Sequence, residues 1–424
     1  MMRCDVAIIG AGPAGLMAAQ TAARLGLKTV LLEKRTDVAR VTRACCEQLI
    51  MDRDFQGDTV RLEAGTIMSL ANSFSVPYCG PSQGLTHKHF VSPAGRVIHF
   101  ANPDLSPIVI KIDKGLLLKG LWDACADAGV DVRAGAHVND VSDTHDGVEL
   151  SIVRSGIRER LAADRLVIAD GVNSRTAARM GINSNRQCLA TALCVIYSLE
   201  NAHGFQPDTL YTFFGRAYRG LAPITITAGR QPGLTSLVVI GNRGNPPGKL
   251  FQKIIAEGVL APQLRQARLV GRLGCAARAY MPMRDPVHGH VLVIGDAAAY
   301  VEVEMQGALA CGFHAGRAVA EELAGHGGFE SYVRWWQRSF EFNGDDWLQV
   351  AQGFALVPAY TDEELDYLFG LVQDEVLEGT YNQYRSPRVM WGAILGHAKR
   401  IGAERPELYE KIRGRAKAQL SDML

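Results

Sequence analysis

Residues 4–26, CDVAIIGAGPAGLMAAQTAARLG, decide the fold of this chain. The apolar run Cys4–Gly10 predicts a short buried strand, and the small and apolar residues after it predict a helix that begins directly at the glycines. Gly10, Gly12 and Gly15 form a G-x-G-x-x-G pattern. In such a loop the first glycine allows a tight turn, the second lets a pyrophosphate approach the backbone, and the third lets the helix pack closely on the strand. Because the helix start also offers free N–H groups to phosphates, the segment predicts a dinucleotide site.

A second strand with an acidic end strengthens this prediction. The segment KTVLLEKR ends its apolar run at Glu33, in the place, roughly 20 residues after the third glycine, where an acid accepts hydrogen bonds from ribose hydroxyls. A carboxylate there disfavours a 2′-phosphate, so FAD or NAD is preferred to NADP. The neighbouring residues expected at this site are Pro13, Ala14 and Lys34.

Residues 161–181, LAADRLVIADGVNSRTAARMG, repeat the order of strand, turn and helix. The turn falls at Asp170 and Gly171, directly after the apolar strand. An Asp at the end of such a strand can bind hydroxyl groups of a cofactor. Taken alone, the segment is equally well explained as a parallel strand with a capped helix.

Residues 291–323 contain a third strand, which ends at Gly295 and Asp296 and is followed by a loop and a long helix. We expect this helix to begin near Gly307. Its N-terminus, with Gly307 and Ala308, can face the electron-rich end of an isoalloxazine ring, while Asp296 can bind ribityl hydroxyls. The segment taken alone is also explained as a parallel strand with a capped helix.

Together the three segments resemble the fingerprints of the large FAD-dependent family that includes para-hydroxybenzoate hydroxylase and the geranylgeranyl reductases. The resemblance covers roughly residues 1–335. It implies FAD as cofactor and an α/β fold: a Rossmann-type FAD-binding domain of the glutathione reductase-like kind, an inserted antiparallel β-sheet substrate domain, and a C-terminal helical region.

Details of the third fingerprint resemble the geranylgeranyl reductase branch more than the hydroxylases. The hydroxylases carry a histidine where this chain has Ala299, and Val303 stands where the reductase branch has a proline. The residues that match the reductase spacing are Gln306, Gly307, Ala308 and Gly312.

The segment TRACCEQLIMD places Cys45 beside Cys46. From the residues alone, the pair can be two small buried side chains, a vicinal disulfide or part of a metal site. Neither a second cysteine pair nor a nearby histidine has the spacing of metal ligands. RACCEQL resembles a K-x-C-G-x-x-L-like segment of the reductase branch that lies beside the flavin, with Arg43 for its Lys and Cys46 for its Gly. The resemblance implies that Arg43 and Cys45 contact the cofactor and that both thiols face the active site. There a thiol could donate a proton, trap an intermediate or form an adduct.

Three further positions follow from the same resemblance. Lys114 takes the place of an Arg that approaches the flavin chain, and Val138 lies in a strand whose backbone contacts adenine. YRGLAP resembles a Y-x-W-x-F-P motif at its Tyr and Pro, so Tyr218 is expected either to handle a proton or to be a sheet residue with an exposed hydroxyl. Gly220 and Ala222 replace the two aromatics of that motif, so a prenyl chain is not assured as substrate.

The rest of the chain predicts the other domains. Alternating stretches such as TALCVIYSLE and LTSLVVIGN predict an antiparallel sheet that covers the flavin and lines a substrate cavity. His87 and His89 lie two residues apart, so their side chains are expected on the same face of one strand. We expect them to be surface or hydrogen-bonded residues of the sheet, in preference to metal ligands or acid–base groups. The expected domains are an FAD-binding domain of residues 1–50, 104–180 and 276–330, a substrate sheet of 51–103 and 181–275, and a C-terminal helical region of 331–424.

Composition narrows the class of protein. The chain has 424 residues, is 47% hydrophobic and 21% charged, and carries a formal net charge of +1, so it can bury a large core and gives no electrostatic argument for nucleic acid. Because no apolar run is long enough for a transmembrane helix and no leader precedes the first motif, we expect a cytoplasmic protein, with peripheral membrane contact left open. Nine cysteines suit reduced thiols better than a disulfide framework.

These features predict an FAD-dependent reductase or dehydrogenase. Hydride would pass between flavin N5 and a carbon–carbon double bond of a small hydrophobic, isoprenoid-like or other substrate, while Cys45, Cys46 or Tyr218 handles the proton. One alternative is a monooxygenase or halogenase of the same fold that acts through a C4a-peroxyflavin. Another is a non-catalytic flavin-binding sensor or assembly protein. The electron donor, NAD(P)H, ferredoxin or a quinol, is left open.

Overall fold

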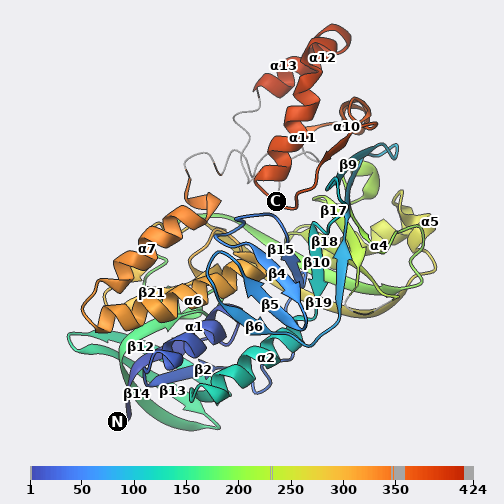
Figure 1. Ribbon diagram of the computed structural model, residues 1–424. Coiled ribbons are helices and arrows are strands. Elements are labelled where there is room, and N and C mark those ends of the chain that lie inside the picture. The colour runs from blue at the N-terminus through green and yellow to red at the C-terminus, as the bar shows by residue number, and fades with distance from the viewer. Residues whose placement is uncertain (1, 230, 232, 345–346, 348–358, 415–424) are drawn as a thin grey trace.

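The first predicted strand lies at the centre of a parallel sheet. The structure is a computed structural model, which describes residues 2–229, 231, 233–344, 347 and 359–414 (Figure 1). In spatial order the parallel strands are β11 (Asp131–Ala134), β2 (Thr29–Glu33), β1 (Met2–Ile9), β14 (Ile157–Ile168) and β21 (Val291–Val293). The apolar runs of β2, β1, β21 and the last part of β14 are buried on both faces, as is typical of parallel strands.

Antiparallel strands extend this sheet. A meander of β12 (Ala136–Thr144) and β13 (Gly147–Arg154) pairs with the first part of β14, and β21 pairs with the last part of the same edge. The short strand β20 (Val287–His288) runs antiparallel to β21.

Small residues let two helices pack closely on this sheet. The helices α1 (Pro13–Arg24) and α6 (Glu304–Leu323) run side by side (Figure 1). A Cβ atom at Gly312 would lie 2.3 Å from the carbonyl oxygen of Ala14, and Gly316 approaches the α1 backbone in the same way. The other helices of this part are α2 (Lys114–Asp127), α3 (Arg175–Arg179) and α7 (Gly328–Ser339).

The second large sheet combines strands from two insertions and one strand from the C-terminal region. Its order is β19 (Arg268–Tyr280), β15 (Cys188–Glu200), β18 (Thr235–Gly241), β17 (Ile224–Ala228), β16 (Thr209–Phe213), β8 (His87–Val91), β9 (Val97–Ala101) and β22 (Val376–Glu378). The expectation of an antiparallel sheet is wrong at two places, because β16 pairs with β8 and β22 pairs with β9 in parallel. These are the two pairings at which distant segments of the chain meet.

Smaller elements join the two large sheets. One three-stranded sheet contains β3 (Gln48–Ile50), β10 (Val109–Ile112) and β7 (Ser82–Leu85). The other contains β4 (Val60–Glu63), β5 (Thr66–Ser69) and β6 (Ser75–Pro77). The short helices are η1 (Arg216–Tyr218), α4 (Pro247–Glu257), α5 (Ala261–Leu264), η2 (Gly295–Ala297) and η3 (Glu341–Asn343).

The C-terminal region is mostly helical and covers the end of the second sheet (Figure 1). Its helices are α10 (Asp362–Gly370), α11 (Arg385–Gly396), α12 (Ala398–Glu404) and α13 (Pro406–Gly414). The helical pattern expected after Asp362 ends at Gly370, and the chain then forms the strand β22 instead. The last part of the predicted helical region, residues 415–424, lies outside the described residues. In the part of the chain described, no helix combines the length and apolar character needed to cross a bilayer.

Two groups of aromatic side chains pack within the fold. His87 and His89 share one face of the second sheet with His99, and the Nδ1 atom of His87 lies 2.9 Å from Nε2 of His99. The indole of Trp336 is fully buried and donates a hydrogen bond to the Met283 carbonyl at 2.7 Å. Trp336 is therefore a core residue.

Candidate active site

The three glycines of the first loop differ in backbone conformation and in the space around them. Gly10 has φ +103°, and a Cβ atom there would lie 2.5 Å from the carbonyl oxygen of Ala169. A Cβ atom at Gly15 would lie 1.8 Å from the carbonyl oxygen of Gly10. Gly12, the residue that caps α1 before Pro13, has φ −79° and no atom within 4 Å of an added Cβ. The fold itself therefore requires Gly10 and Gly15, whereas Gly12 leaves open space into which a ligand can approach the backbone.

Glu33 ends β2 beside this loop and is buried. One carboxylate oxygen accepts a hydrogen bond from the Ala11 amide at 2.8 Å, and the other accepts from the amide and the Nε atom of Arg35, at 2.9 and 3.0 Å. Burial opposes ionisation, but the hydrogen bonds and positive charge of Arg35 outweigh it and hold the pKa of Glu33 below its ordinary value. Lys34, which was also predicted at the site, has an exposed side chain.

The second predicted turn places Asp170 at the end of β14. One oxygen of its carboxylate accepts hydrogen bonds from the amide and hydroxyl of Thr176, at 3.2 and 3.0 Å. The other oxygen is buried and has no partner among the described atoms. Gly171 follows with φ +89°, and an added Cβ there would lie 3.4 Å from a guanidinium nitrogen of Arg43. A buried acceptor without a partner is what a hydroxyl-bearing cofactor would satisfy.

The third turn lies against the first. A Cβ atom at Gly295, which has φ +63°, would lie 3.4 Å from the Cβ atom of Ala14. Asp296 accepts a hydrogen bond from the Val303 amide at 3.0 Å. Burial raises the pKa of Asp296, and the positive charges of Lys114 and Arg43 partly oppose this rise.

The helix after this turn begins three residues earlier than expected. Its first residue, Glu304, has φ +56°, a left-handed conformation that is strained for a residue with a side chain. Gly307 and Ala308, which were predicted at the cofactor, therefore lie in the body of the first turn of α6. Gly307 is buried, and a Cβ atom there would lie 3.0 Å from the Cβ atom of Gln56.

All these turns lie at one edge of the parallel sheet, because the carboxyl ends of parallel strands meet at the same edge. The edge combines an open glycine backbone at Gly12, a charged acceptor at Glu33 and a buried unpartnered acceptor at Asp170. This set suits the phosphates, ribose and ribityl hydroxyls of FAD, so the residues present fit the cofactor.

The cysteine pair lies between this edge and the second sheet. Cys45 and Cys46 are free and half-buried. The Nζ atom of Lys114 lies 3.5 Å from Sγ of Cys45, and the ammonium of Lys111 donates a hydrogen bond to the Cys46 carbonyl. Burial raises the pKa of both thiols, with Lys114 opposing the rise at Cys45 and Lys111 opposing it at Cys46. Both side chains are therefore protonated at neutral pH and suit proton donation better than nucleophilic attack.

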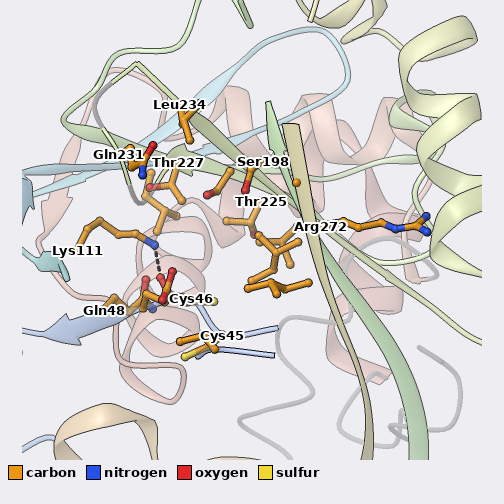
Figure 2. Close-up of a pocket in the computed structure, with 18 of the residues that line it drawn as sticks. Cys45, Cys46, Gln48, Lys111, Ser198, Thr225, Thr227, Gln231, Leu234 and Arg272 are labelled. Atoms are coloured by element: carbon orange, nitrogen blue, oxygen red, sulfur yellow. Dashed lines mark hydrogen bonds between the residues drawn. The ribbon is translucent and has the colours of Figure 1, made fainter. Parts of the chain in front are cut away.

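A cavity of about 430 Å³ opens beside the two cysteines (Figure 2). One wall is the segment from Cys45 to Gln48 with Lys111, and the facing wall is the second sheet, where hydroxyl side chains including Thr225 and Thr227 point inward (Figure 2). Apolar residues of the same sheet complete the facing wall: Ile196, Val238 and Leu273. Arg272 extends away from the other labelled side chains. The cavity thus offers both apolar contacts and hydrogen-bonding groups.

Tyr218, which was predicted as a catalytic residue, does not come to this cavity. Tyr218 is buried in η1, and its hydroxyl donates a hydrogen bond to the Ser92 carbonyl at 2.6 Å. This hydrogen bond and the packing around Tyr218 correct the expectation of a proton-handling or exposed hydroxyl. Val138 lies at a bulge in β12, and its carbonyl accepts a hydrogen bond from Arg179 at 3.2 Å.

Sequence patterns missed two residues of the cavity. Lys111 interrupts the apolar strand VIKI, which was a usable signal, because a buried lysine in such a strand needs a reason. Tyr381 belongs to the C-terminal region yet lines the cavity. No local pattern links Tyr381 to a site formed by residues so distant in the chain.

Comparisons with known proteins agree with this geometry. Residues 3–52 match the FAD binding domain family. Digeranylgeranylglycerophospholipid reductase of Methanothrix thermoacetophila is 26% identical over 400 residues, which cover 88% of this chain and 92% of the relative. Digeranylgeranylglycerophospholipid reductase 1 of Methanococcoides burtonii is 23% identical over 382 residues, which cover 87% of this chain and 88% of the relative.

Solved structures with the same fold carry out different reactions. A geranylgeranyl bacteriochlorophyll reductase-like protein of Thermoplasma acidophilum superposes with a TM-score of 0.73 at 20% identity and covers 98% of this chain and 100% of its own. The p-nitrophenol 4-monooxygenase of Pseudomonas putida superposes with a TM-score of 0.60 at 13% identity, covering 98% and 100%. These structural likenesses confirm the fold, and with the domain match and the fit of the site they confirm FAD as the cofactor.

Proposed function

We propose that this chain, a FAD-dependent oxidoreductase related in sequence and fold to the geranylgeranyl reductases, reduces a carbon–carbon double bond of an isoprenoid-like lipid. The observation that carries the proposal is the cavity that has Cys45 and Cys46 on one wall and the cofactor edge beside it. The names of the sequence relatives, which are reductases of a digeranylgeranyl lipid, support the same substrate class. An alternative role as a non-catalytic sensor offers no reason for such a cavity.

Bound FAD supplies the hydride, and the chain supplies binding, orientation and the proton. Gly12 and the α1 N-terminus would hold the pyrophosphate, Glu33 the ribose, and Asp170 and Asp296 the hydroxyls of the ribityl chain. Among the predicted cofactor ligands, Arg43 and Lys114 bring positive charge to the same region, because both act on the carboxylate of Asp296.

The proton for the second carbon of the double bond would come from a thiol. Cys45 is the better placed donor, because Lys114 lies 3.5 Å from its sulfur and can stabilise the thiolate that remains. Lys111 holds the backbone at Cys46, which fixes the direction of the loop. An isoprenoid-like lipid would bring the chain to a membrane surface, and this peripheral contact stays a prediction.

The test is the mass of the product. FAD-loaded protein, reduced with dithionite without oxygen, is mixed with a digeranylgeranyl glycerophospholipid, and a gain of two hydrogens per reduced double bond is expected. Cys45→Ala should slow product formation on the order of 100-fold, as loss of a general acid does, whereas Cys79→Ala, an exposed cysteine, serves as control.

Two outcomes would contradict the proposal. Incorporation of oxygen or halide in aerobic reactions, with no gain of hydrogen in anaerobic ones, would show a monooxygenase or halogenase. If Cys45→Ala and Cys46→Ala both react at the wild-type rate, the thiols do not supply the proton.

A further inference from the structure

Two more cysteines lie on the second sheet, next to residues that line the same cavity. Cys194 on β15 and Cys275 on β19 are directly opposite each other in the antiparallel register. Because side chains alternate along a strand, Cys194 shares a face with Ile196, and Cys275 shares one with Leu273. Ile196 and Leu273 line the cavity, so the two sulfur atoms lie on the cavity side of the sheet, one step nearer the cofactor edge.

The two thiols interact with each other and with the cofactor edge. The thiols of Cys194 and Cys275 are electrostatically coupled to each other, and Cys275 also feels the charge of Arg43. Arg43 in turn approaches Gly171, at the second cofactor turn. The interaction with Cys194 and the positive charge of Arg43 lower the pKa of Cys275, whereas the interaction with Cys275 and burial raise the pKa of Cys194. One sulfur is therefore poised as a thiolate beside a protonated partner, as in reactive dithiols.

The register also permits a bond between these sulfurs. Directly opposed residues of antiparallel strands have Cα atoms about 4.5 to 5.5 Å apart, within the range of roughly 4.4 to 6.8 Å that disulfides span. Both side chains are half-buried, so a small thiol can reach them through the cavity.

We propose that Cys194 and Cys275 form a thiol–disulfide couple that takes two electrons from a dithiol donor and passes them to the bound flavin. The inference rests on the proposed function for the presence of FAD and adds a class of electron donor. The donor dithiol reduces the Cys194–Cys275 disulfide by exchange, becoming a disulfide itself. The two thiols then give two electrons and two protons to the flavin as their S–S bond re-forms, so the net change is oxidation of the donor and reduction of FAD.

The first experiment counts thiols and needs no flavin. The protein is equilibrated with mixtures of reduced and oxidised dithiothreitol, alkylated and mapped by mass spectrometry. The expected result is a reversible loss of two thiols and a peptide pair linked through Cys194 and Cys275. Cys194→Ser and Cys275→Ser should each abolish this linkage, and Cys188→Ser, an exposed cysteine on the same strand, should not. A pair that stays reduced in every mixture overturns the proposal.

The second experiment follows reduction of the FAD-loaded protein by dithiothreitol without oxygen. Cys194→Ser and Cys275→Ser are expected to slow flavin bleaching at least about tenfold, while bleaching by dithionite stays at the wild-type rate. If the disulfide maps but bleaching is unchanged in both variants, electron entry through the pair is disproved. Failure of the protein to bind FAD would instead contradict the proposed function, and the thiol count separates the two cases.

Discussion

At the scale of single residues, the first glycine loop separates what the fold needs from what a ligand needs. Gly10 and Gly15 are fixed by contacts within the protein, since an added Cβ at either would overlap a carbonyl oxygen. Gly12 has an ordinary φ of −79° and free space around it. A side chain at Gly12 is therefore expected to obstruct a bound ligand without disturbing the packing of the protein.

This difference predicts that alanine at one glycine lowers the stability of the protein and that alanine at the other weakens FAD binding. Gly15→Ala should destabilise the protein without cofactor by at least about 3 kcal/mol, because α1 must move away from the carbonyl of Gly10. Gly12→Ala should change stability by less than about 0.5 kcal/mol but weaken FAD binding at least about tenfold. Thermal unfolding of the cofactor-free protein and FAD fluorescence titration measure the two effects. Wild-type affinity in Gly12→Ala would place the pyrophosphate elsewhere.

At the scale of elements, local patterns predicted what local forces determine. The strand, glycine loop and helix at the start of the chain follow from apolar runs and from the spacing of the glycines, two of which close packing explains. The strands β15 and β18 follow from alternation. The parallel pairs of β16 with β8 and β22 with β9 could not be predicted, because each joins segments that are far apart in the sequence and carry no turn signal between them.

The strand β8 carries a buried charge that makes its packing sensitive to pH. Lys88 is 3% exposed and donates hydrogen bonds to the Thr380 carbonyl and the Ser386 hydroxyl, at 3.1 and 2.6 Å. Burial lowers its pKa to about 7, against the opposing charge of Asp52. The native state therefore binds fewer protons than the unfolded state between about pH 7 and the ordinary lysine pKa of about 10.4.

The sign of this difference predicts that stability rises with pH. The free energy of unfolding should increase by up to about 4 kcal/mol as the pH rises through that window, because the cost of neutralising Lys88 falls away. Urea unfolding at about pH 7.5 and about pH 9.5 measures the rise. Lys88→Met should remove it, whereas Ser386→Ala, which keeps the amine, should retain it. An equal rise in Lys88→Met would assign the effect to other groups.

At the scale of the whole molecule, the cavity is assembled from three regions that meet only in the folded chain. The cysteine loop provides one wall, the second sheet provides the facing wall, and Tyr381 contributes from the C-terminal region. Asp52 joins the first and last of these, because it accepts hydrogen bonds from the Thr380 hydroxyl and from the Tyr381 amide, the latter at 2.9 Å. The C-terminal region thus lines the candidate site as well as covering the end of the second sheet.

Removing one of these hydrogen bonds should loosen the cavity without changing its chemistry. Thr380→Val keeps the shape of the fully buried side chain but removes the hydroxyl that donates to the Asp52 carboxylate and accepts from the Asn382 amide, at a cost of about 1 to 3 kcal/mol. Amide hydrogen exchange in residues 376–386 should become faster, and KM for the lipid should rise more than kcat falls. Thr361→Ala is the matched control, because it removes the capping box of α10 at a cost of about 1 kcal/mol. In Thr361→Ala, amide exchange should become faster only within α10, and KM should not change. An equal change of KM in both variants would show that the C-terminal region acts on the cavity through general stability and not through Asp52.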